Sequence, residues 1–438
     1  MFLISLILPI FIRVFRLAEP SGPYQIGTVT YHWTDVDRQE IFSINLEDRR
    51  QLMAQVWYPV QGDSSAARAP YVIDAAAVSA GLARTLSSNG LIKLPSFAFN
   101  HFQDVPTHAI PSAAIAANKT SFPVLIYLTG LDGFRQASMF QVEHLVSHGY
   151  VVVGLDQPYT AVSVTFPNGQ IIDGLSKSQI QPLIDQSISP VDDAPRLNGR
   201  SLPNGIIPYL AEDVSFVLDQ LELLNAAEGM WNGRLDLQHV GVFGVSLGAM
   251  TAAEACHSDP RLSACLMMDA AMPAGVVNTG LPQPGIWLTR PADDMRRERT
   301  RMGGWTEQDI EETLTTMQAV FDKASPDSSY FVSIPGMFHL NFTDAPYYSP
   351  FTSLLGLTGP INGQRGFDIV NAYTLAFFNK SLRGELSPLL SESSQRYPIE
   401  FIFRTKHLIC NLIPQFDLFC ISEIEGRLGS ASRAINST

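Results

Sequence analysis

Residues 239–255 read HVGVFGVSLGAMTAAEA, an apolar strand followed by a Gly-x-Ser-x-Gly motif and an alanine-rich helix. The motif runs from Gly244 to Gly248 and has Ser246 at its centre. A strand that turns this sharply into a helix leaves room only for small residues beside the serine. The turn raises the serine hydroxyl above the sheet, next to a helix N-terminus that stabilises negative charge. The sequence therefore predicts that Ser246 is a nucleophile.

Apolar runs alternate with helical patterns on both sides of this motif. We expect buried strands at 122–128, 150–155, 239–243, 264–268, 285–289 and 330–334, and helices at 138–148, 206–224, 249–255 and 306–323. Two segments rich in β-formers, 24–32 and 52–58, come first and predict an antiparallel pair. Strands that alternate with helices indicate a parallel sheet with helices on both faces. The predicted class is α/β, with the α/β-hydrolase fold and a mostly parallel central sheet.

Two long segments interrupt this alternation. Residues 73–117 are rich in alanine and serine with helical spacing, and residues 156–204 hold many Pro, Ser, Asn and Gly residues. Long loops inside a compact domain are usually functional or disordered. We therefore expect lid-like insertions that shape the site. Tyr159, Val162 and Phe166 are candidates for an apolar substrate rim, and ordinary packing of these residues is the alternative.

The patterns divide the chain into an N-terminal apolar segment (1–22), a catalytic domain (23–386) and an irregular C-terminal tail (387–438). The apolar run at residues 2–12 is shorter than the ~20 residues that span a bilayer. It also lacks the basic start and the cleavage site of a regular signal peptide. An export signal, the stub of a membrane anchor and an apolar strap on the domain all stay open. We expect a secreted or envelope-associated protein in preference to a cytoplasmic one, with association to a membrane or lipid surface as a further expectation.

Composition argues against several classes of function. Of the 438 residues 46% are apolar and 16% charged, which predicts a globular protein with a large core. Acidic residues outnumber basic ones by 42 to 29, so we expect no nucleic-acid partner. The four cysteines lack the spacing of zinc sites, and we expect neither a metal nor a cofactor. Cys256 and Cys265 flank a predicted turn, where a disulfide and two buried thiols are equally open.

A serine nucleophile needs a histidine base and an acid that orients the histidine. In this fold the chain order is serine, acid, histidine, and only His257, His339 and His407 follow Ser246. His257 follows the motif too closely to return over the serine, and His407 lies in the tail. His339 follows the last predicted strand by five residues, in a loop that can deliver an imidazole. We expect His339 to be the base; a surface histidine is the alternative.

Two places are open for the acid. Asp269 ends the first strand after the motif, whereas Asp293 and Asp294 follow the second strand, which the general topology of the fold slightly favours. Asp293 and Asp294 stand beside Arg290, Arg296 and Arg297, a pattern typical of a solvated, ion-paired loop. Asp269 instead ends an apolar strand, where a carboxylate without a partner is costly.

The oxyanion of the reaction needs two backbone N–H donors. Leu247, directly after the nucleophile, supplies the first. The second is expected from the loop that follows the strand at 122–128, and we assign it to Leu131 because the glycines on either side free the backbone to turn. Asp132 would oppose the anion unless its carboxylate points away.

Five blocks of sequence carry a resemblance to a known family. They are TGLDGFR at 129–135, LVSHGY at 145–150, the motif around Ser246, MDAAMP at 268–273 and GMFHLNF at 336–342. Together, over residues 22–386, they resemble the plasma-type platelet-activating factor acetylhydrolase family and its bacterial lipase-like relatives. In that family the acid follows the first strand after the motif, which implies Asp269, and the enzymes are calcium-independent. The chain departs from the family pattern at Val245 and Ala249, where histidine and glycine are usual, and at Thr129, where histidine precedes the glycine.

The predicted function is carboxylic-ester hydrolysis by a triad of Ser246, Asp269 and His339, acting on short-chain acyl esters. The resemblance implies the sn-2 acetyl or short acyl group of phospholipids as substrate. A lipase, a cutinase-like enzyme or a polyester hydrolase on the same fold is the alternative. A non-catalytic binding module is the rival class, and it predicts the loss of a triad member.

Overall fold

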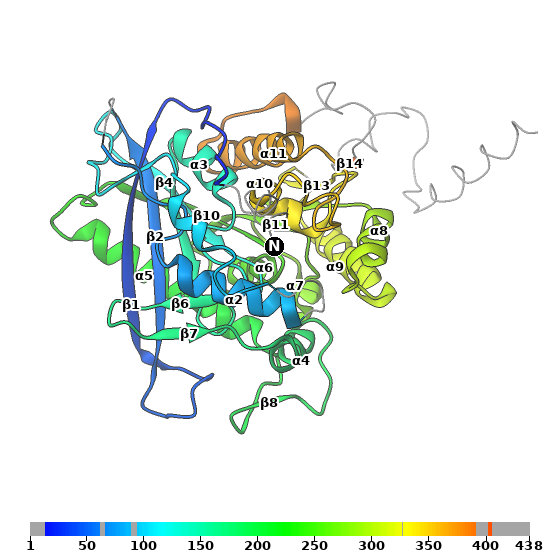
Figure 1. The fold of residues 1–438 in the computed structure, drawn as a ribbon. Helices are drawn as coiled ribbons and strands as arrows, with labels where there is room; N and C mark the ends of the chain where they lie inside the picture. The colour runs from blue at the N-terminus through cyan, green and yellow to red at the C-terminus, as the bar shows by residue number, and fades with distance from the viewer. Residues whose placement is uncertain (1–13, 62–65, 89–93, 326, 391–401, 405–438) are drawn as a thin grey trace, which may run out of the picture. The chain divides into compact units, whose positions relative to one another are not determined.

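The computed structural model describes residues 14–61, 66–88, 94–325, 327–390 and 402–404. Ten strands form one sheet in the order β14-β13-β12-β11-β10-β4-β5-β2-β1-β3 (Figure 1). The parallel centre consists of β4 (Phe122–Leu128), β5 (Val151–Asp156), β10 (Leu235–Val245), β11 (Leu262–Met268), β12 (Gly285–Thr289) and β13 (Ser329–Ser333). Every residue of β4 and β5 is buried, as expected for strands covered on both faces.

The edges of the sheet are antiparallel or short. On one side β1 (Gln25–Gln39) and β2 (Arg49–Val60) form a long antiparallel pair, β2 joins β5, and β3 (Ala109–Pro111) pairs with β1. On the other side β14 (Ile402–Arg404) runs antiparallel to β13. The expected α/β fold with a mostly parallel sheet is therefore confirmed.

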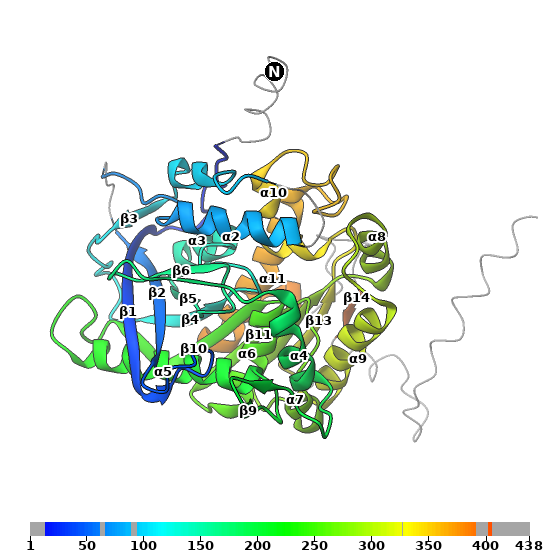
Figure 2. The same cartoon turned by 60° about the horizontal axis from the view of Figure 1, so that its bottom comes forward.

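Helices cover both faces of the sheet (Figure 2). Buried side chains of α3 (Met139–Ser147) and α11 (Gly363–Arg383) share one apolar cluster with residues of one face, and α2 (Ala75–Ser88) packs into it. The other face packs against α5 (Ile207–Ala226), α6 (Leu247–Ser258), α7 (Ala274–Thr279) and α9 (Glu307–Lys323). Along β4, for example, Val124 and Ile126 belong to one cluster and Leu125 and Tyr127 to the other, because side chains alternate across a sheet.

The segment after β5 folds over the carboxyl end of the sheet. It contains β6 (Ser163–Thr165), β7 (Ile171–Asp173), α4 (Lys177–Ile188), β8 (Arg196–Leu197) and β9 (Arg200–Ser201). Ile180, Leu183 and Ile184 of α4 pack with Phe42, with the start of α5 and with Leu247, and we call this group the excursion cluster. Leu131 and Tyr159 pack against it as partly buried residues. The segment at 73–117 is mixed, with η1 (Asn100–Asp104) and β3 after α2.

Several elements differ from the sequence-based expectation. Residues 292–302 form helix α8 (Ala292–Met302), not a solvated loop, and α11 has no counterpart among the expected helices. Two short elements, η3 (Pro388–Leu390) and β14, lie in the region expected to be irregular. Phe15 and Leu17 are buried in the core, so the described part of the N-terminal segment packs on the domain. The apolar run at 2–12 lies outside the described residues, as does most of the tail.

Cys256 and Cys265 form a disulfide that joins the last turn of α6 to β11. Of the two alternatives left open by the sequence, the structure therefore contains the disulfide. Within the described ranges, no helix is both long and apolar enough to cross a bilayer.

Candidate active site

Ser246 lies in the tight turn between β10 and α6. Its backbone angles, φ 56° and ψ −125°, are those of a strained turn, and its amide donates to the carbonyl of Met268 at 2.9 Å. A Cβ added to Gly244 would lie 2.3 Å from the carbonyl oxygen of Gly248, and one added to Gly248 would lie 2.1 Å from that of Leu128. Both glycines of the motif are therefore required by the close approach of backbone.

Asp269 and His339 are hydrogen-bonded to each other. His339 Nδ1 lies 2.7 Å from Asp269 Oδ2, which leaves Nε2 as the ring nitrogen available to a nucleophile. Asp269 follows β11 and is fully buried, and Thr289 Oγ1 donates to its other oxygen at 3.1 Å. The His339 side chain keeps 20% of its surface exposed, as a base that must meet substrate requires.

The pKa of Asp269 is lowered to about 2. Burial opposes ionisation of this carboxyl group, but the charge of Arg290 and the hydrogen bonds from His339 and Arg290 outweigh it. The carboxylate is thus ionised at neutral pH. It can hold the imidazole in one tautomer and stabilise the imidazolium that forms when the histidine takes a proton.

The loop that carries His339 is fixed by buried polar side chains. The Gly336 amide donates to Asp294 Oδ2 at 2.7 Å, and the His339 amide donates to Glu298 Oε2 at 3.2 Å. Asn341 Oδ1 accepts from the amides of Phe338 and Gly359 at 2.8 and 2.7 Å. The position of the imidazole is therefore set by α8 and by η2 (His339–Phe342).

The alternative candidates within the described residues have other partners. Asp293 pairs with Arg296 at 3.0 Å, and Asp294 pairs with Arg297 at 3.1 Å while it binds Gly336 in place of an imidazole. His257, at the end of α6, lies 3.2 Å from Thr279 Oγ1. His407 lies outside the described residues.

Of the two expected oxyanion donors, Leu247 follows the serine directly and Leu131 follows Gly130, which approaches the serine. Leu247 is the first residue of α6, where amides have no acceptor within the helix. In the described part of the chain, the Leu131 amide likewise has no hydrogen-bond acceptor. A Cβ on Gly130 would lie 3.1 Å from Ser246 Cβ, so the loop approaches the serine as bare backbone. The Asp132 carboxyl group contacts Thr85 of α2, and burial raises its pKa.

The three expected rim residues lie in three different environments. Tyr159 is partly exposed, has φ 71°, and stacks on Phe42 in the excursion cluster. Val162 is buried in the core beside α2. Phe166 is buried in a separate small cluster with Met53 and Val164, and contacts the ring of His32. Only Tyr159 combines exposure with a place beside the candidate oxyanion loop.

The sequence reasoning missed Arg290 as a site residue. It was placed in a solvated loop, but its side chain is fully buried and its Nε donates to Asp269 Oδ2 at 2.8 Å. Glu298 and Trp305 complete its surroundings. The available signal was its position directly after β12, where a side chain points to the same edge as Asp269.

Comparisons with known proteins find similarity to ester hydrolases. A family model described as platelet-activating factor acetylhydrolase, isoform II, matches residues 11–172, ahead of Ser246. A probable 1-alkyl-2-acetylglycerophosphocholine esterase of Arthroderma benhamiae is 24% identical over 416 residues, which cover 89% of this chain and 94% of that protein. The chain is thus similar to the platelet-activating factor acetylhydrolases. A platelet-activating factor acetylhydrolase of Cavia porcellus is 21% identical over 268 residues, which cover 60% of this chain and 58% of that protein.

A solved structure extends the comparison. Ferulic acid esterase from Streptomyces cinnamoneus superposes on this chain with a TM-score of 0.66 at 26% identity, over 89% of this chain and 99% of that one. The expected enzyme class, an ester hydrolase, is therefore confirmed. Among the described residues, no group of three or more His, Cys, Asp or Glu side chains is placed to hold a metal ion.

Proposed function

We propose that this protein hydrolyses carboxylic esters with short acyl groups, through Ser246, His339 and Asp269. The hydrogen bond between His339 Nδ1 and Asp269 Oδ2, on the same edge of the sheet as the Ser246 turn, carries the proposal. A histidine oriented by a carboxylate serves as the base for a serine nucleophile.

The proposed reaction has two halves. Ser246 Oγ attacks the ester carbonyl while His339 takes its proton, and the amides of Leu131 and Leu247 stabilise the oxyanion. His339 then gives the proton to the leaving alcohol, which departs and leaves an acyl-serine. A water molecule enters, gives a proton to His339 and attacks the acyl carbon. The acid is released, and the proton returns to Ser246.

We further propose phospholipids with an acetyl or short sn-2 acyl group as the natural substrate class. The relatives in Arthroderma benhamiae and Cavia porcellus support this choice through their printed names. The ferulic acid esterase supports the alternative of a different carboxylic ester, such as an ester of ferulic acid, on the same fold. The Cys256–Cys265 disulfide supports export to an oxidising compartment, which we also propose.

The experiment pairs site variants with a substrate series. Ser246→Ala and His339→Ala should each lower kcat by at least roughly 10⁴-fold while the fold is retained. A phosphonate probe should label Ser246. Hydrolysis of p-nitrophenyl esters should fall with acyl length, and a short sn-2 phospholipid should be cleaved in preference to a long-chain one and to a feruloyl ester. Activity that survives Ser246→Ala contradicts the mechanism, whereas preference for the feruloyl ester contradicts only the substrate class.

A further inference from the structure

Arg290 and Glu298 connect both members of the Asp269–His339 pair. Arg290 Nε donates to Asp269 Oδ2 at 2.8 Å, the same oxygen that His339 Nδ1 contacts at 2.7 Å. Arg290 Nη1 donates to Glu298 Oε2. Glu298 Oε2 also accepts from the backbone amide of His339 at 3.2 Å. The four residues therefore form a closed ring of hydrogen bonds that begins and ends at His339.

This ring places a full positive charge in the interior. The Arg290 side chain is completely buried, and its Nη2 has no hydrogen-bond partner in the described structure. Its guanidinium lies 5.0 Å from the ring centre of Trp305, which meets the His339 ring edge-on at 5.3 Å. A buried guanidinium with an unmet donor is costly, and the aromatic face offsets only part of that cost. Packing alone therefore does not explain why the Arg290 guanidinium is buried.

The net charge beside His339 supplies a reason for burying Arg290 together with Glu298. A cation beside Asp269 on its own would weaken the stabilisation that this carboxylate offers to an imidazolium. Glu298 cancels that cation, so Asp269, Arg290 and Glu298 together keep one net negative charge, as a lone carboxylate would. Arg290 can then fix the orientation of Asp269 without loss of its electrostatic effect.

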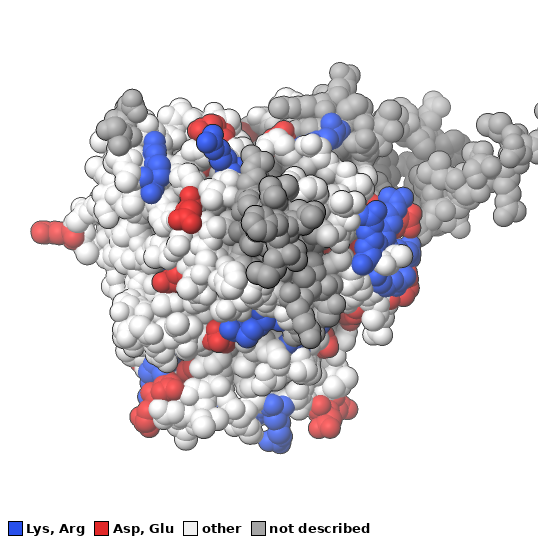
Figure 3. All heavy atoms as spheres, in the orientation of Figure 1, with Lys and Arg blue, Asp and Glu red and all other residues white. Residues whose placement is uncertain are grey.

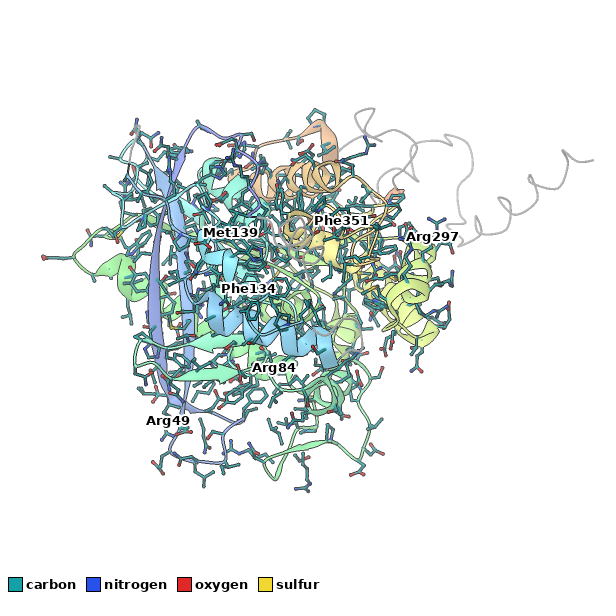
Figure 4. All side chains as sticks on the ribbon, viewed as in Figure 1. Arg49, Arg84, Phe134, Met139, Arg297 and Phe351 are labelled. Atoms are coloured by element: carbon teal, nitrogen blue, oxygen red, sulfur yellow. A yellow bond between two sulfur atoms is a disulfide. The ribbon has the colours of Figure 1, made fainter. Side chains whose placement is uncertain are left out.

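We propose that Arg290 and Glu298 are a matched pair of positioning residues, in which Arg290 fixes Asp269 Oδ2 while Glu298 cancels the charge of Arg290 and anchors the His339 backbone. The inference rests on the proposed function, in which His339 is the base. The other charged groups near this loop are already paired or capped. Asp294 of α8 pairs with Arg297, labelled in Figure 4, and Asp344 accepts from the amides of Met139 and Phe140.

The test is the acid limb of the kcat/KM profile against pH, which reports proton uptake by the essential base. Arg290→Met raises the negative charge beside His339 and should move the limb to higher pH by roughly one unit. Glu298→Gln leaves Arg290 unbalanced and should move it to lower pH by a similar amount. The double variant restores one net charge and should return the limb close to its original position. In each single variant kcat should fall at least roughly tenfold with KM little changed, because positioning rather than binding is lost.

A matched control lies on the surface nearby. Charged side chains of both signs gather over α8 (Figure 3), and Arg296 pairs there with Glu307 at 2.5 Å with both side chains about half exposed. Arg296→Met and Glu307→Gln make the same charge changes outside the ring and should leave the limb in place. A purely structural role for Arg290 and Glu298 would lower activity without opposite shifts, and that result would overturn the inference.

Two further variants, Arg290→Lys and Ser246→Ala, distinguish failure of this inference from failure of the proposed function. If Arg290→Met does not fold, Arg290→Lys replaces it, because lysine keeps the charge without the planar guanidinium. This variant should lower kcat while the acid limb stays in place. A moved limb would contradict the inference. Ser246→Ala is assayed beside them. Ester hydrolysis that survives Ser246→Ala refutes the proposed function itself. Serine-dependent hydrolysis with unmoved limbs in Arg290→Met and Glu298→Gln refutes only the role of the pair.

Discussion

Ser246 and Asp269 have positive φ angles, 56° and 50°, although neither is a glycine. Conformations of this kind cost roughly 1–3 kcal/mol each and persist only where the surroundings fix them. Here the neighbouring strands fix them, because the Ser246 amide donates to Met268 and the Asp269 amide to Leu288 at 2.9 Å each. Backbone strain thus occurs at two of the three residues to which we assign the chemistry.

The first residue-level prediction separates the two candidates for the acid. Asp269→Asn should lower kcat by up to roughly 10⁴-fold, because an amide beside His339 Nδ1 favours the wrong tautomer. Asp294→Asn should change kcat little, since Asp294 binds the Gly336 amide and Arg297 instead of the imidazole. Steady-state kinetics of both variants, with circular dichroism to confirm folding, decide between them. If Asp294→Asn is the inactive variant, Asp269 loses the assignment.

Gly130 offers a second test at this scale. A methyl group there would lie 3.1 Å from Ser246 Cβ and 3.3 Å from the carbonyl oxygen of Val245, so we expect the loop to shift outward by a few tenths of an ångström. The shift would move the Leu131 amide away from the forming oxyanion, and the loss of one such donor lowers kcat by roughly 10²–10³-fold. We expect Gly130→Ala to show this loss with an almost unchanged Tm. Full activity would show that the second donor comes from another residue.

Chain order predicted His339 as the base but left two places for the acid, and the family resemblance favoured Asp269. Both residues follow predicted strands, and such ends meet at one edge of a parallel sheet. Arg290 was misplaced for a physical reason. In the sequence it stands among Asp293, Asp294 and Arg296, and a cluster of charges usually indicates solvent. Its burial depends on Glu298, which only becomes a neighbour once α8 has formed.

At the scale of elements, the segment between β5 and α5 decides what surrounds Ser246. Its helix α4 packs into the excursion cluster with Leu247, while its hairpin of β6 and β7 packs in a different cluster with Met53. Tyr159 belongs to the first and Phe166 to the second. The two halves of the segment should therefore have different effects on substrate choice.

We predict that Tyr159→Ala changes the acyl chain-length profile, whereas Phe166→Ala does not. Tyr159 is partly exposed, stacks on Phe42 and packs beside Leu131, so its removal widens the apolar surface next to the oxyanion loop. Phe166 is 2% exposed, and its loss should lower the free energy of unfolding by about 3–5 kcal/mol instead. The ratio of kcat/KM for short and long p-nitrophenyl esters, with urea unfolding of each variant, measures both effects. An unchanged ratio in Tyr159→Ala would mean that this residue only packs.

Elements with a strong apolar pattern in the sequence were predictable, whereas elements whose formation depends on tertiary packing were not. The strands β4 and β5 are continuous apolar runs, which indicate a buried parallel sheet directly. Helix α11 contains glycine, asparagine and several aromatic residues, which favour helix only weakly. It is helical because Phe367, Val370 and Phe377 on one side pack into the core against the sheet.

In the whole molecule, the sheet brings the residues of the candidate site together from distant parts of the chain. Gly130, Ser246, Asp269, Arg290 and His339 come after β4, β10, β11, β12 and β13, at the carboxyl ends of neighbouring parallel strands. This is the edge at which open α/β sheets bind ligands. The Cys256–Cys265 disulfide joins α6 to β11 and so links the elements that carry the serine and the acid.

Two buried carboxylates, those of Asp269 and Asp213, should govern the stability of the fold in acid. The pKa of Asp269 is about 2 in the folded protein, and that of Asp213 is also lowered because Arg50 and Arg38 outweigh the effect of its burial. Both values lie below the ordinary value for aspartate, so the unfolded chain takes up protons first as the pH falls. Their stabilisation is complete above about pH 4 and is lost as the pH falls further, for Asp269 down to about pH 2. Asp269 alone contributes about 2 kcal/mol in this way.

Urea unfolding at a series of pH values tests this expectation. The free energy of unfolding should fall steeply below about pH 4 in the wild-type protein. In Asp269→Asn and Asp213→Asn it should start lower but fall less steeply, because each variant lacks one of the carboxylates that must be protonated. Asp293→Asn is the matched control, since the Asp293 side chain is 79% exposed and pairs only at the surface with Arg296. A slope in Asp269→Asn equal to that of the wild type would show that this carboxylate does not couple folding to pH.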